Sequence, residues 1–187
     1  MLENKNKRKS IRLKSYDYSE PSDYFVTICA EDRKCLFGEI VDGEMVLNSL
    51  GEIVKEEILN ILRRFINVEI DIFCIMPNHI HIILSILCGE DCPIVGATLA
   101  VARNQDRAGA SPAPTVGDII GSFKSICFKR YKNYILKNGL NVKTKFWQRN
   151  YYEHVIRNEK SYDEIYTYIE SNASLWEKDR NNPKNLV

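Results

Sequence analysis

Apolar and polar residues alternate with two different periods along this chain, and the changes of period predict its strands and helices. Runs with strand composition occur over Tyr24–Ala30 and from Ile70 to Leu87, where nearly every other residue is apolar and many are β-branched. Because Pro77-Asn78 interrupts the longer run, we expect two short buried strands there. Phe146–Ile156 predicts a final strand.

Three segments have the period of helices, with apolar residues recurring every three or four positions. The first opens at a capping box, Ser49-x-x-Glu52, and ends before Asn67. The second runs from about Val116 to Lys137. The third opens at another capping box, Ser161-x-x-Glu164.

Between the first strand and the first helix, Asp42-Gly43 stands among β-forming residues, so a small hairpin is expected over Gly38–Leu47. The resulting order is βαββαβ followed by one more helix. It predicts an α+β fold, a ferredoxin-like split βαβ antiparallel sheet with an additional C-terminal helix.

Length and composition favour one domain over residues 1–187, with residues 1–20 as a basic N-terminal arm and residues 88–114 as a flexible loop or insertion. No apolar run is long enough to cross a bilayer, and the basic start lacks the apolar segment of a secretory signal. We therefore expect a cytoplasmic protein without membrane contact. The six cysteines form no disulfide-like framework.

Charge changes this picture, because the net charge of +1 hides two basic blocks. Residues 1–14 hold six basic side chains against one acid. Residues 119–149 hold eight basic side chains and no acid, interleaved with aromatic residues. Such blocks favour contact with a polyanion such as nucleic acid, although a solvated helix face explains either block alone equally well.

The candidate chemistry lies where the two buried strands meet, in Met76-Pro-Asn-His-Ile-His81. Residues i and i+2 of a strand point to the same face, so His79 and His81 should lie side by side while Ile80 faces the core. Neutral imidazoles are good ligands for divalent transition metals. The plain alternative is a pair of half-exposed strand histidines.

Partners for a metal site occur on the last predicted helix. Tyr168 and Asn172 are four residues apart and therefore share one face, at the border of the buried stripe. A phenol beside a divalent cation can act as a nucleophile toward a phosphate, and the Asn172 oxygen could be a third ligand. Simple packing is the alternative for a tyrosine in a segment this rich in tyrosine.

Taken together and in order, five motifs resemble the REP-associated tyrosine transposases, relatives of the single-tyrosine HUH transposases of the IS200 type. The resemblance extends from about Tyr24 to Trp176. The motifs are Met76-Pro-Asn-His-Ile-His81, Gly121-Ser-Phe-Lys-Ser125, Phe146-Trp-Gln-Arg149, Tyr152-Glu-His-Val-Ile-Arg157 and Tyr168-Ile-Glu-Ser-Asn172.

The resemblance implies that His79 and His81 hold Mg²⁺ or Mn²⁺ and that Tyr168 attacks a phosphate of single-stranded or hairpin DNA. The product would be a 5′-phosphotyrosine link and a free 3′-OH. Asn172 stands where relatives commonly have a longer glutamine as the third metal ligand. The expected protein is a monomer or homodimer.

Seven further residues are candidates for DNA contact, by their charge or their aromatic ring. Trp147 has core packing as its alternative, and a structural role is open for His154. Two other functions also stay open, a non-catalytic nucleic-acid-binding protein and a metal-dependent hydrolase that uses water. The DNA-contact candidates are Lys124, Lys129, Arg130, Lys132, Trp147, Arg149 and His154.

Overall fold

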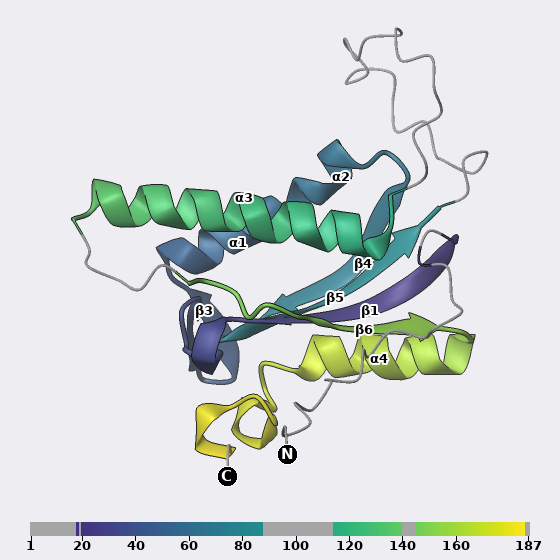
Figure 1. The fold of residues 1–187 in the computed structure, drawn as a ribbon. Coiled ribbons are helices and arrows are strands. Elements are labelled where there is room, and N and C mark those ends of the chain that lie inside the picture. Colours follow the sequence, from purple (N-terminus) through teal and green to yellow (C-terminus); the bar gives the residue numbers. More distant parts are fainter. Residues whose placement is uncertain (1–17, 19, 88–113, 140–144, 186–187) are drawn as a thin grey trace, which may run out of the picture.

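A four-stranded antiparallel sheet forms the centre of the molecule, with helices on both of its faces (Figure 1). The computed structural model describes residues 18, 20–87, 114–139 and 145–185. In the sheet, the strand order is β4-β5-β1-β6 and every neighbouring pair is antiparallel. The strands are β1 (Ser22–Cys29), β4 (Val68–Ile75), β5 (His79–Ile86) and β6 (Tyr152–Ile156).

The helices lie in two layers. On one face of the sheet lie α1 (Ser49–Leu59), α2 (Ile61–Arg64) and α3 (Val116–Lys137). The opposite face carries α4 (Glu159–Ser171), which contacts β4 and β5. The predicted α+β fold, with its split βαβ sheet and extra C-terminal helix, is thereby confirmed.

Short elements complete the described chain. The predicted hairpin is present as a separate two-stranded sheet, and its turn uses Asp42 and Gly43 with φ values of 51° and 82°. Three 3-10 turns follow β1 or α4. These elements are β2 (Gly38–Val41), β3 (Glu44–Leu47), η1 (Glu31–Arg33), η2 (Trp176–Lys178) and η3 (Pro183–Asn185).

Strand alternation divides the apolar side chains between two cores. The larger core lies between the sheet and helices α1 and α3, and Ile80 is part of it, as expected from the sequence. The smaller core, beneath α4, contains Phe25, Ile83, Ile156 and Ile169. Every residue of β5 is buried, because both faces of this inner strand are covered.

The two predicted capping boxes at Ser49 and Ser161 are wrong, because an asparagine caps each helix instead. The Asn48 side chain accepts hydrogen bonds from two backbone N–H groups of α1, and Asn158 accepts one from Ser161 of α4. Asparagine is as good an N-cap as serine, so each helix starts a little before the expected serine position. The first helix also breaks at Asn60 into α1 and α2.

The final strand is shorter than the predicted Phe146–Ile156. Trp147 forms an isolated bridge with Ala30, and regular pairing resumes only in β6. Between them the Lys124 ammonium donates to the carbonyl oxygens of Gln148 and Arg149, at 2.6 and 3.0 Å. These carbonyls are therefore satisfied by a side chain of α3 and not by a neighbouring strand.

Two predicted segments lie largely or wholly outside the described residues, namely the basic arm over residues 1–20 and the loop over residues 88–114. Within the described part of the chain, no helix combines the length and the apolar composition that crossing a membrane requires.

Candidate active site

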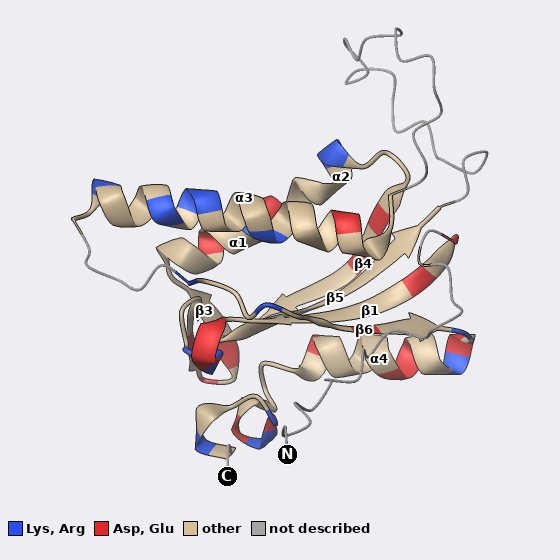
Figure 2. Ribbon diagram, in the orientation of Figure 1, with Lys and Arg blue, Asp and Glu red and all other residues tan. Residues whose placement is uncertain are grey.

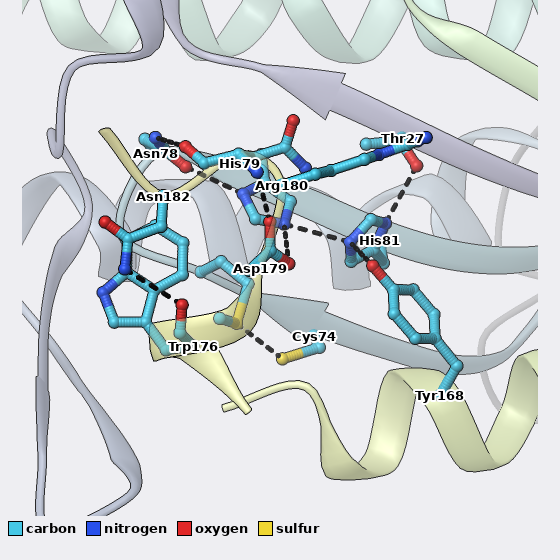
Figure 3. A network of polar contacts seen from close by, with 12 residues as sticks. Thr27, Cys74, Asn78, His79, His81, Tyr168, Trp176, Asp179, Arg180 and Asn182 are labelled. Carbon is cyan, nitrogen blue, oxygen red and sulfur yellow. Dashed lines mark hydrogen bonds and ion pairs between the residues drawn. The ribbon is translucent and has the colours of Figure 1, made fainter. Parts of the chain in front are cut away.

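The two histidines lie side by side on the face of β5 that α4 covers (Figure 3). His81 pairs with Thr27 of β1 and with Cys74 of β4, so it stands on an inner strand of the sheet. Both imidazoles are completely buried, and their Nε2 atoms are 3.0 Å apart. The alternative of half-exposed strand histidines is therefore wrong, because α4 and the chain that follows it cover this face.

A buried amide fixes the proton on His79. The Asn78 Nδ2 donates to the carbonyl oxygens of Arg33 and Asn181, at 2.9 and 2.8 Å. Its Oδ1, which can only accept, lies 2.8 Å from the His79 Nδ1. The neutral His79 ring must therefore carry its proton on Nδ1, which leaves the Nε2 lone pair free to bind a cation.

His81 has a partner that can either donate or accept. The Thr27 hydroxyl lies 2.8 Å from the His81 Nδ1. When Thr27 donates, the His81 Nε2–H can donate to the His79 Nε2. When Thr27 accepts, the His81 Nε2 also has a free lone pair, and both Nε2 atoms can bind one cation.

Burial keeps both rings neutral. It lowers the pKa of His79 to about 4, against a smaller raising effect of the Asp179 carboxylate. The pKa of His81 is well below its usual value, chiefly through burial and then through the neighbouring His79. Neutral imidazole is the form that binds metals.

A buried carboxylate lies beside the histidines, and a second buried oxygen stands one helical turn after Tyr168. The Asp179 Oδ2 is 3.7 Å from the His79 Nε2, and ligand atoms of His79, His81 and Asp179 all lie within 4.8 Å of one another. The Asn172 side chain is also buried, and its Oδ1 has no hydrogen-bond partner among the described residues. A carboxylate facing a bare imidazole lone pair, together with an unpaired amide oxygen, fits a divalent cation.

Tyr168 brings a hydroxyl to the same cluster. Its oxygen lies 3.2 Å from the His81 Nε2, and its ring packs edge-on against Phe25. The side chain is 37% exposed, so one side of it is open to solvent. Burial of the other side raises the pKa of Tyr168, as does Asp179, while the Asn172 amide opposes the shift.

The predicted DNA contacts are spread over both faces of the sheet. Lys129 and Lys132 are exposed on α3, across the sheet from the histidines. Figure 2 shows several Lys and Arg positions along this helix. Arg149 and His154 are exposed near and on the edge strand β6. His154 is paired with Phe25, so it shares the face on which the two histidines lie.

Three of the predicted DNA contacts have structural partners. Arg130 forms ion pairs with Glu56 and Glu57 of α1. Lys124 holds the two carbonyls described above. Trp147 is 8% exposed and packs in the larger core, so the structure gives it the packing role that the sequence left open.

Sequence reasoning missed Asp179, Arg33 and Arg180. Asp179 follows η2, and Arg33 ends η1. All three lie in irregular segments without periodicity, and none belongs to a recognisable motif. Their position near the histidines follows from the tertiary structure, and no signal in the sequence predicts it.

Comparison with known proteins gives one close relative. No family model matches the chain. An uncharacterized protein of Haemophilus influenzae is 42% identical over 173 residues, which span 92% of each chain. The chain belongs to the family of this protein.

Two solved structures are similar at lower identity. A REP-associated tyrosine transposase bound to a REP hairpin is 20% identical, with a TM-score of 0.48 over 86% of this chain and 72% of its own. A "putative transposase" from Deinococcus radiodurans is 14% identical, with a TM-score of 0.46 over 85% of this chain and 95% of its own. Similarity at this level does not assign a function to this chain.

Proposed function

We propose that this protein is a metal-dependent DNA strand transferase of the HUH single-tyrosine type, acting on single-stranded or hairpin DNA. The observation that carries the proposal is the 3.2 Å contact between the Tyr168 hydroxyl and the His81 Nε2, which itself lies 3.0 Å from the His79 Nε2. A nucleophile thus lies next to a buried nitrogen pair fit for a cation. The sequence motifs supply the class of substrate.

His79 and His81 would hold the cation, Mg²⁺ or Mn²⁺, through their Nε2 atoms. Asp179 is the best-placed oxygen ligand, because its carboxylate already faces His79. Asn172 is the ligand that the family resemblance implies, and its free Oδ1 supports that role. When bound, a divalent cation withdraws charge from the phosphate and favours the phenolate of a nearby tyrosine.

The chain's own residues account for the remaining chemistry. The Tyr168 oxygen forms the new bond to phosphorus, and the bond from phosphorus to the 3′ oxygen breaks. The phenolic proton leaves to solvent, and the departing 3′ oxygen takes up a proton. The DNA stays attached to Tyr168 by its 5′ phosphate, so the same site can rejoin strands without an external energy source.

A denaturing gel tests this proposal. The protein is incubated with end-labelled hairpin DNA and Mn²⁺, and a covalent adduct is expected to migrate above the free strand. Tyr168→Phe should bind DNA but give neither adduct nor cleavage. His79→Ala and His81→Ala should likewise give neither, while Tyr166→Phe is the matched control, because its exposed ring stacks on Tyr162 and lies outside the cluster.

Two results would contradict the proposal in different ways. Binding by the wild-type protein without adduct or cleavage would indicate a non-catalytic DNA-binding protein. Cleavage that survives Tyr168→Phe without an adduct would indicate a hydrolase that uses water.

A further inference from the structure

Two arginines that no motif identified lie at the histidine cluster. Arg33 ends η1, directly after β1, and Arg180 follows Asp179 near the end of the described chain. The Arg33 Nη1 is 3.4 Å from the Arg180 carbonyl oxygen, so the two segments lie side by side. The Arg180 side chain extends past His79 toward Thr27 (Figure 3).

The charges of these arginines reach the groups proposed to react. Arg180 contributes to the lowered pKa of both histidines, after burial, and it opposes the raised pKa of Tyr168. Arg33 contributes to the lowered pKa of His79. The Arg180 side chain reaches toward Thr27, the hydroxyl partner of His81, whereas the Arg33 guanidinium lies at the Arg180 carbonyl, so Arg180 is the nearer of the two to the reacting atoms (Figure 3).

The described part of the chain gives neither guanidinium a carboxylate within ion-pair distance. Among the described residues, Arg33 and Arg180 form no ion pair with a carboxylate, whereas Arg64 and Arg130 are both paired with Glu57. A planar guanidinium without a carboxylate partner can donate two parallel hydrogen bonds to phosphate oxygens.

The backbones of the two arginine-bearing segments are held by the side chain of Asn78. The buried Asn78 amide donates to the carbonyl of Arg33 and to that of Asn181, next to Arg180, while its oxygen orients His79. Asp32 and Arg33 have φ values of 55° and 52°, a region that non-glycine residues rarely adopt. One side chain thus fixes a proposed metal ligand and both arginine-bearing segments, one of them in a strained conformation.

We propose that Arg33 and Arg180 bind phosphates of the DNA substrate, Arg180 the phosphate that Tyr168 attacks and Arg33 a neighbouring phosphate of the same strand. This inference rests on the proposed function. Negative charge accumulates on the attacked phosphate in the transition state, so Arg180 acts mainly on the rate of cleavage. Arg33 acts mainly on DNA affinity.

Single-turnover cleavage and DNA binding separate these roles. The Kd for hairpin DNA is measured by fluorescence anisotropy in a Tyr168→Phe background, and Mn²⁺ binding by calorimetry. Arg180→Ala should slow adduct formation roughly 100-fold with a small change in Kd, as expected for loss of one charge-stabilising donor. Arg33→Ala should weaken DNA binding about tenfold, as expected for one charge-assisted hydrogen bond, and leave the rate at saturating DNA nearly unchanged.

The controls distinguish binding from structural roles. Arg180→Lys should recover only part of the rate, because lysine keeps the charge but not the paired donors. Arg157→Ala removes an exposed arginine beyond the end of β6 and should match the wild type. Arg180→Ala should bind Mn²⁺ at least as tightly as the wild type, because a like charge is removed, whereas a merely structural role would weaken Mn²⁺ binding.

The outcomes are separable from those of the proposed function. An adduct that forms at the wild-type rate in Arg180→Ala, or a loss of Mn²⁺ binding along with the rate, overturns the role of Arg180. An unchanged Kd in Arg33→Ala overturns the role of Arg33. If the wild-type protein forms no adduct, the proposed function fails. In that case, DNA affinity still tests this inference: a variant with both Arg33→Ala and Arg180→Ala that binds hairpin DNA as tightly as the wild type would overturn it as well.

Discussion

The neutral state of the buried histidines should make the protein less stable in mild acid. His79 has a pKa of about 4 in the folded chain, against about 6.5 when unfolded. Between these values the unfolded chain binds more protons, so the free energy of unfolding falls as pH falls from 6.5 toward 4. Because a tenfold difference in proton affinity corresponds to about 1.4 kcal/mol, the full loss from His79 is about 3 kcal/mol, of which about 2 kcal/mol is lost by pH 5.

Urea denaturation at several pH values between 8 and 5 measures this effect above the range in which most carboxylates titrate. His79→Gln removes the titrating group and should flatten the pH dependence by about 2 kcal/mol over this interval. A dependence of the same sign from His81 should remain in this variant, because the pKa of His81 is lowered too.

The reasoning would be refuted if the wild-type free energy of unfolding were flat from pH 8 to pH 5. It would equally be refuted if His79→Gln and the wild type lost the same free energy over that interval, since the protons would then bind elsewhere.

Three other substitutions test the assigned contacts. Asn78→Ala removes the acceptor that orients His79, so Mn²⁺ affinity measured by calorimetry should fall about 10- to 100-fold, and an unchanged affinity would contradict the assigned tautomer. Arg130→Ala leaves the buried Glu57 with Arg64 as its remaining ion-pair partner, so urea denaturation should show a loss of about 1–3 kcal/mol; an unchanged stability would argue against that network. Trp147→Ala empties part of the larger core and should lower the free energy of unfolding, measured in urea, by about 3–5 kcal/mol. A variant of unchanged stability with reduced DNA affinity would instead support the predicted role of Trp147 in base stacking.

The fold could be predicted from the sequence because its signals are local and repeated. Strand alternation places His79 and His81 on one face and Ile80 in the core, as the structure shows. Helix periodicity places Tyr168 at the border of a buried stripe. Two helices begin earlier than predicted, because asparagine and serine are nearly equivalent N-caps. In each case an asparagine, Asn48 or Asn158, lies shortly before the predicted serine and caps the helix instead.

The depth and completeness of the site could not be predicted. Whether strand histidines are exposed depends on what covers their face of the sheet, and here α4 and the segment after it cover them. Asp179 and Arg180 lie in the segment after α4, which the Asn78 amide holds through the Asn181 carbonyl, and Arg33 lies in the turn after β1, which the same amide holds through the Arg33 carbonyl. These are tertiary contacts between irregular segments, and the hydrophobic periodicity of the sequence does not predict such contacts.

The central claim, that Tyr168 is the nucleophile, is tested most directly by locating the covalent bond. After reaction with hairpin DNA and Mn²⁺ and digestion with nuclease and trypsin, tandem mass spectrometry can examine the peptide Ser161–Lys178, which contains Tyr162, Tyr166 and Tyr168. We predict a nucleotide mass attached to Tyr168. The same mass on Tyr151 or Tyr152, in the separate peptide over residues 150–157, or the absence of any adduct, would contradict the account.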